Sequence, residues 1–159
     1  MDAFTAALAT ILIGLPAFYS DAEEPSARET RMSTVVAPAL VDVASEATCS
    51  DAYATPECKK LWPGTKTDLA MMLLTKGFWE SRFALHVQAG KCGPRECDAY
   101  KDHRTNRIIH RSASYFQVQA TGLVPVTEWR TLTGLDYDAT RRAAWAAAKV
   151  ASASRNRCA

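Results

Sequence analysis

One segment near the middle of the chain must form a helix that other elements surround. Residues 69–74 read Leu-Ala-Met-Met-Leu-Leu, so apolar side chains point in every direction around the helix axis. Such a helix is stable only when protein covers all of its faces. Thr65 and Asp68 have the spacing of a capping box, which marks the start of a helix. The sequence therefore predicts a buried helix that begins near Thr65.

A second helix is predicted before this segment and an irregular region after it. Between Arg28 and Val43 apolar residues recur at helical spacing, and Pro38 is expected to kink the helix that they form. Residues 84–113 have no sustained periodicity and contain two cysteines and two glycines. We interpret residues 84–113 as a loop lobe.

The last part of the chain is again helical in pattern. Residues 127–132 are expected to form a short helix that Gly134 ends. An Ala-rich helix then continues to about Ser152, with Asp138 or Thr140 as its N-cap. No convincing set of alternating strands is present. The predicted fold class is therefore mainly α, a helical domain with an irregular loop lobe.

The composition indicates one globular domain, because 48% of the 159 residues are hydrophobic and 23% are charged. The longest apolar run, residues 3–18, is shorter than the roughly 20 residues of a membrane span, so no stable span is predicted. We interpret this run as an export signal or anchor, with an apolar helix packed on the domain as the alternative. The acidic stretch over residues 21–27 is interpreted as a linker. The chain is thus divided into a segment over residues 1–27 and a domain over residues 28–159. The protein is expected to be a monomer.

Charge is unevenly distributed along the chain. The formal net charge is only +2, which does not favour nucleic acid as a partner. Residues 1–75 carry five Lys and Arg against ten Asp and Glu, whereas residues 76–159 carry fourteen against seven. A basic half suits an anionic partner such as a bacterial cell wall or a phosphate polymer, and a solvated basic surface is the alternative.

Five cysteines have no metal-finger spacing, either among themselves or with the histidines, so neither a metal nor another cofactor is predicted. Cys92 and Cys97 flank a turn-prone segment and are expected to form a local disulfide. Cys49 pairs with Cys58 or, alternatively, with Cys158, and the spacing leaves this choice open. Disulfides favour an oxidising compartment.

Glu80 is the candidate catalytic residue. At 100° per residue it lies on nearly the same helix face as Leu69 and Leu73, so its carboxyl group is predicted to be partly desolvated. A carboxylic acid in such a place can act as a general acid. The alternative is a helix-end Glu that pairs with Lys76 or Arg82 on the surface.

Two motifs, in this order and spacing, resemble those of one known superfamily. The first is Glu80-Ser81 at the end of an apolar helix, and the second is Ser-Ala-Ser-Tyr-Phe-Gln-Val-Gln over residues 112–119. Together they are similar to the soluble lytic transglycosylase and goose-type lysozyme superfamily, over about residues 65–153. The resemblance implies a lysozyme-like fold and cleavage of the β-1,4 bond after N-acetylmuramic acid in peptidoglycan.

The resemblance also implies roles for single residues. Glu80 matches the catalytic acid/base, and Ser81 matches the residue that helps to orient it. Gln117 matches the Gln that meets the substrate, while Ser114 stands where the family usually has Gly. The residues expected to contact the glycan are Ser81, Ser114, Tyr115, Phe116, Gln117 and Tyr100. Trp79 and Phe116 also fit a hydrophobic core, and the core is favoured for both.

Two routes of cleavage are compatible with this set of residues. In the route implied by the resemblance, the acetamido group of the substrate stabilises the developing cation and one carboxylate suffices. Hydrolysis instead needs a positioned water, usually with a second carboxylate, for which Asp98 and Asp102 are the candidates. The predicted function is thus a muramidase or lytic transglycosylase, exported to the periplasm, cell wall or medium, or delivered by a phage. The alternative is a catalytically silent wall-binding or virion structural module with the same fold.

Overall fold

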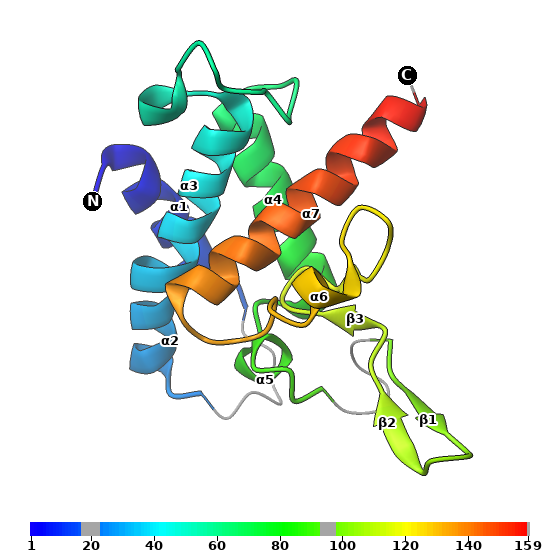
Figure 1. Ribbon diagram of the computed structural model, residues 1–159. Helices are drawn as coiled ribbons and strands as arrows, with labels where there is room; N and C mark the ends of the chain where they lie inside the picture. Colours follow the sequence, from blue (N-terminus) through cyan, green and yellow to red (C-terminus); the bar gives the residue numbers. More distant parts are fainter. Residues whose placement is uncertain (17–22, 93–97, 159) are drawn as a thin grey trace.

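The computed structural model describes residues 1–16, 23–92 and 98–158, with side chains up to residue 155. Most of the described chain is helical, which confirms the predicted mainly α class (Figure 1). The larger helices are α1 (Ala3–Gly14), α2 (Pro25–Arg31), α3 (Ala37–Thr48), α4 (Lys66–Ser81) and α7 (Tyr137–Cys158). Short helical turns are the 3₁₀ turn η2 (Asp51–Tyr53), α5 (Leu85–Gln88) and α6 (Val126–Trp129).

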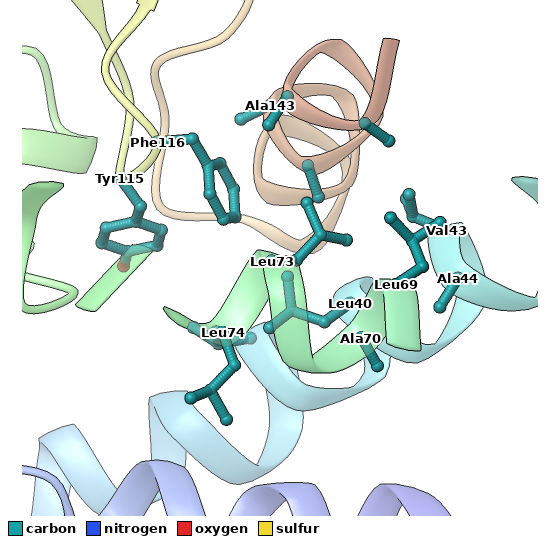
Figure 2. Close-up of a cluster of buried hydrophobic side chains, with 14 of the residues drawn as sticks. Leu40, Val43, Ala44, Leu69, Ala70, Leu73, Leu74, Tyr115, Phe116 and Ala143 are labelled. Atoms are coloured by element: carbon teal, nitrogen blue, oxygen red, sulfur yellow. The ribbon is translucent and has the colours of Figure 1, made fainter. Parts of the chain in front are cut away.

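The predicted buried helix is α4, and it lies between α3 and α7 (Figures 1 and 2). Leu69 and Leu73 of α4 have no exposed surface. Met71 of the same apolar run is 41% exposed, so one face of α4 is open to solvent and the expectation that protein covers every face is wrong. The capping box is present, because the Asp68 N–H donates to the Thr65 hydroxyl at 3.1 Å and the Thr65 N–H donates to the Asp68 carboxylate at 2.9 Å. Hydrogen bonds from the backbone and hydroxyl of Thr65 lower the pKa of Asp68. Local sequence therefore determines where α4 begins.

Pro38 lies inside a long helical segment without breaking it. The π-helical turn η1 (Met32–Val36) joins α2 to α3, and Pro38 occupies the first turn of α3. A proline ring collides with the carbonyl four residues earlier in a regular α-helix, and proline has no N–H to donate. The wider π turn relieves both conflicts, because its hydrogen bonds join residues five apart, as from the Ala37 N–H to the Met32 carbonyl.

The apolar segment at the N-terminus is part of the core. It forms α1, which contacts η1 and α3 and buries Leu8 and Leu12. This packing corresponds to the alternative in which the apolar run is a helix on the domain. Residues 17–22 lie outside the described residues, and α2 already begins at Pro25, inside the segment interpreted as a linker. No helix within the described ranges is long and apolar enough to cross a bilayer.

Short strands form in the lobe predicted as irregular and, in the case of β4, just after it. β1 (Tyr100–Asp102) pairs antiparallel with β2 (Arg107–Ile109), and β3 (Ser112–Ala113) pairs antiparallel with β4 (Val118–Gln119). Each strand has only two or three residues, which is too short for an alternating pattern to identify.

The last helix differs from its prediction in two details. Its N-cap is Asp136, whose carboxylate accepts from the Ala139 N–H at 2.8 Å, so the expectation of Asp138 or Thr140 is wrong. This hydrogen bond contributes to the lowered pKa of Asp136. The helix also continues to Cys158, beyond the expected end near Ser152.

One disulfide is resolved by the structure. Cys49 is bonded to Cys58, which is the first of the two predicted alternatives, and the pairing of Cys49 with Cys158 is wrong. The left-handed residue Cys49 ends α3 and turns the chain back, so that the two Cα atoms lie 5.8 Å apart. Cys92 also takes part in a disulfide, whereas Cys97 and the side chain of Cys158 lie outside the described residues.

Candidate active site

A groove of about 480 Å³ lies at the C-terminal end of α4, bordered by α7 and the loop lobe. Helix α4 contributes Lys76 and Glu80 to its lining, and α7 contributes Ala147 and Val150. The loop lobe contributes Asp98 and Ser112, and the segment that follows it contributes Gln117, Val118, Gln119 and Thr121. Glu80 and Gln117, which belong to different motifs of the sequence, therefore line the same groove.

The Glu80 carboxyl group is less desolvated than the sequence predicts. Its side chain is 42% exposed, and one oxygen accepts from the Lys76 ammonium at 3.0 Å. Leu69 and Leu73 on the same helix face are fully buried, but Glu80 lies in the last turn of α4, where the helix leaves the core. The contact with Lys76 is the helix-end ion pair that the sequence analysis gives as the alternative. The Glu80 carboxylate nevertheless lines the groove.

Ser81 shapes the turn that ends α4. Its hydroxyl donates to the Gly77 carbonyl at 3.0 Å and accepts from the Phe83 N–H at 3.1 Å. Arg82 and Phe83 both have positive φ, at 50° and 54°, so the chain turns away sharply after Glu80. Ser81 is 5% exposed and both of these hydrogen bonds join it to backbone, so it fixes the place of Glu80 by holding the helix end.

We expect Gly77→Ala to destabilise the protein, although alanine usually favours a helix over glycine by about 1 kcal/mol. A Cβ at position 77 would lie 2.4 Å from the ring of Phe83, which is itself only 1% exposed. The ring cannot move without opening the core, so we expect a net loss of about 1–3 kcal/mol in the free energy of unfolding, measured in urea. Gly14→Ala is the control, because nothing lies within 4 Å of its Cβ position. A Gly77→Ala protein as stable as wild type would contradict this account of the turn.

The second motif forms a tight turn that places Gln117 in the groove. Ser114 and Gln117 have positive φ, at 68° and 49°. The Ser114 value is one that glycine adopts most easily. The Gln117 side-chain amide donates to the Ser114 carbonyl at 3.1 Å. The turn thus holds the Gln117 side chain close to its own backbone at the groove wall.

The aromatic residues of this motif belong to the core and not to the groove. Tyr115 is 1% exposed and Phe116 is fully buried, and Figure 2 shows both rings in the cluster of buried side chains. Both rings pack edge-on against Phe83. Ser114 is fully buried as well. The prediction that Ser114 and Tyr115 contact the substrate is therefore wrong, because the two positive-φ residues turn the segment inward between them. Phe116 is not a substrate contact either, and it takes the core position that the sequence favours for it.

Of the three other candidates, Asp98 lines the groove, whereas Tyr100 and Asp102 lie in β1 outside it. Asp98 lines the groove, and one of its carboxylate oxygens accepts from the Gln119 amide at 3.3 Å. Asp102 instead closes the β1–β2 turn, where hydrogen bonds from Thr105 and from the Arg104 N–H lower its pKa. Tyr100 lies in β1 and is not among the residues that line the groove.

Two residues near the site were missed or misplaced by sequence reasoning. Trp79, interpreted as core, is 79% exposed beside Glu80. Gln88 of α5 is fully buried, accepts from the Tyr115 N–H at 2.9 Å, and donates to the carbonyls of Leu132 and Gly134 at 3.0 and 2.9 Å. No local pattern identifies such a glutamine, because all three partners are more than twenty residues away.

The arrangement is suited to proton transfer by carboxyl groups in an open groove. Within the described part of the chain, Glu80 and Asp98 are the acidic residues that line it, with Lys76, Gln117 and Gln119 as the long polar side chains around them. Among the described residues no three His, Cys, Asp or Glu side chains are grouped so that they could hold a metal ion. No family model, curated protein or solved structure matches this chain.

Proposed function

We propose that this protein is a peptidoglycan-cleaving glycosidase or lytic transglycosylase with a lysozyme-like fold. Glu80 is its general acid and base, and the scissile bond is the β-1,4 bond between N-acetylmuramic acid and N-acetylglucosamine. The observation that carries the proposal is that Glu80, at the end of a buried helix, and Gln117, thirty-seven residues later, line one groove. Glu80 and Gln117 also belong to the two motifs that resemble those of lytic transglycosylases and goose-type lysozymes.

The proposed reaction begins with a proton on the glycosidic oxygen. Glu80 donates this proton as the bond to the anomeric carbon breaks, and the acetamido group of the substrate stabilises the resulting positive charge. The Glu80 carboxylate then accepts a proton from the 6-hydroxyl of the same sugar, which closes the anhydro ring. Because Glu80 is paired with Lys76 at 3.0 Å, it must exchange this partner for the glycosidic oxygen when a glycan enters the groove.

A second route ends in hydrolysis and uses Asp98. Among the described residues, Asp98 is the other carboxylate that lines the groove, so it is the candidate to hold the attacking water. Asp102 does not fit this role, since its two oxygens serve the hairpin turn. Mass spectrometry of the products separates the routes, because anhydro products are one water lighter than hydrolysed ones.

The alternative is a catalytically silent wall-binding or virion structural module with the same fold. The observation that favours it is the Lys76–Glu80 ion pair, which is the surface arrangement expected of a glutamate with no catalytic role. Export, or delivery by a phage, goes with both functions, and the Cys49–Cys58 disulfide supports an oxidising compartment.

Replacing the proposed acid tests the two functions against each other. We expect Glu80→Gln to lower the rate at which purified peptidoglycan loses turbidity by at least about 100-fold, because an amide cannot donate the proton. Glu128→Gln is the matched control, since Glu128 is also paired with a lysine, Lys149, at 3.1 Å, and lies outside the groove. Equal activity of wild type and Glu80→Gln would remove Glu80 from the mechanism. A wild type that binds peptidoglycan without clearing it would favour the silent module.

A further inference from the structure

The β1–β2 hairpin stands out because it is not covered by the rest of the protein. Figure 1 shows β1 and β2 extending away from the helices. Between residues 100 and 109 every residue is exposed except Asp102, which is partly buried. A two-stranded hairpin without a covering layer is marginally stable in water. The composition of its exposed surface is therefore informative about what it meets.

The hairpin carries a concentrated positive charge. Lys101, Arg104, Arg107 and Arg111 are exposed, and among the described residues none of them forms an ion pair. The carboxylate of Asp102 is the one acidic group between residues 100 and 111, which gives this stretch a formal charge of +3, against +2 for the whole chain. Such a surface attracts an anionic partner.

The same hairpin exposes large apolar side chains on both of its faces. Tyr100, Ile108 and Ile109 are 42%, 46% and 37% exposed. Tyr100 is paired with Ile109 and therefore shares a face with it, whereas Ile108 is paired with Lys101 on the opposite face. Each face thus combines an apolar side chain with a cation. Lys101 is paired with Ile108 on one face, and on the other the Arg111 guanidinium lies over the Tyr100 ring, 4.6 Å from its centroid.

We propose that the β1–β2 hairpin is an arm that binds an anionic phospholipid surface. A soluble polyanion would contact the cations but gain little from the isoleucines, whereas a bilayer interface takes both. Apolar side chains enter the boundary of the acyl chains, while Lys and Arg remain at the level of the phosphates. Because both faces of the arm are apolar in part, it is suited to lie among headgroups rather than flat on them. Its unpaired strand edges keep it at the interface, where water and headgroups can hydrogen-bond to them.

The position of the arm links it to the groove. Asp98 precedes β1 and Ser112 follows β2, and both line the groove. A protein held by this arm therefore keeps its groove next to the membrane surface. Binding by the arm is independent of the proposed cleavage, so the two can fail separately.

Co-sedimentation with vesicles tests the arm directly. At about 0.1 M salt we expect wild type to bind vesicles that contain phosphatidylglycerol and not vesicles of phosphatidylcholine alone. R104Q/R107Q is expected to weaken binding about 25-fold, from about fivefold for each charge near an anionic surface. I108S/I109S is expected to weaken it at least tenfold, because the apolar contribution is lost.

A control variant and three contrary results complete the test of vesicle binding. K59Q/K60Q removes two charges from another exposed loop and should bind like wild type. Equal binding to both kinds of vesicle, or to neither, would overturn the proposal. Unchanged binding of I108S/I109S would also overturn the proposal, because it would show that charge alone acts. In that case wild type should bind soluble polyphosphate as strongly as it binds vesicles. The comparison of the two vesicle types needs only wild type, so it remains decisive if a variant does not fold.

Discussion

Gln88→Leu is expected to lower the free energy of unfolding by about 3–5 kcal/mol, although glutamine and leucine are similar in size. The fully buried Gln88 amide is the partner of three backbone groups: the Tyr115 N–H, the Leu132 carbonyl and the Gly134 carbonyl. Leucine would leave these groups without that partner, and a buried polar group that loses its hydrogen bond costs about 1–3 kcal/mol. Urea unfolding should show a lower midpoint with an unchanged slope.

Gln88→Glu separates the hydrogen bonds of Gln88 from its shape. A glutamate keeps the acceptor for the Tyr115 N–H but, when ionised, has no proton to donate to the carbonyls of Leu132 and Gly134. We expect this variant to be at least as unstable as Gln88→Leu near neutral pH, and to recover part of its stability in mildly acidic buffer, where protonation restores one donor. If both variants unfold at the wild-type urea midpoint, the three hydrogen bonds do not contribute as described.

Arg31→Met is the second substitution with a large expected effect. The Arg31 side chain is 8% exposed and is paired with Glu23, which is 6% exposed. Its guanidinium donates from Nε to a Glu23 oxygen at 2.7 Å, from Nη2 to the Phe83 carbonyl at 3.1 Å, and from Nη1 to the Tyr115 hydroxyl. Methionine would leave a buried carboxylate without its cation, which typically costs about 3–5 kcal/mol. The free energy of unfolding in urea measures this loss.

A double variant shows whether the loss comes from the stranded charge. We expect Arg31→Met combined with Glu23→Met to be more stable than Arg31→Met alone, because replacing both members of a buried ion pair by apolar side chains is often nearly neutral. A double variant that loses the sum of both single effects would show that the two side chains act independently. Arg31 matters to the site, since it joins α2 to Phe83, three residues after Glu80, and to Tyr115, two residues before Gln117.

The sequence predicts the parts of the fold that depend on neighbours along the chain. Thr65 and Asp68 are three residues apart, so their spacing suffices to predict the capping box and the start of α4. The apolar run after them predicts that the helix is buried, and this holds for the face that carries Leu69 and Leu73, whereas Met71 on another face is 41% exposed. The grouping of Glu80 with Gln117 was predicted from the resemblance of two motifs, and no local rule would have produced it.

Other properties of the site were beyond sequence reasoning for a physical reason. Tyr115 is expected at the glycan and Phe116 is favoured as core, although the two residues are adjacent. The positive φ of Ser114 and Gln117 turns both rings inward. Asp98 and Asp102 are four residues apart and chemically alike, yet one lines the groove and the other closes a hairpin turn.

What the chain determines by itself is a well-capped helix with a buried apolar face, which carries Glu80 in its last turn, within a mainly α domain. What the tertiary structure decided is the surroundings of that glutamate: its ion pair with Lys76, the groove that it shares with Asp98 and Gln117, and the buried contacts of Arg31 and Gln88. The division has one physical cause. Helix caps and apolar faces depend on residues a few positions apart, and so does the Lys76–Glu80 ion pair. The groove and the buried contacts of Arg31 and Gln88 join segments that are distant in sequence, and these segments meet only when the core has packed.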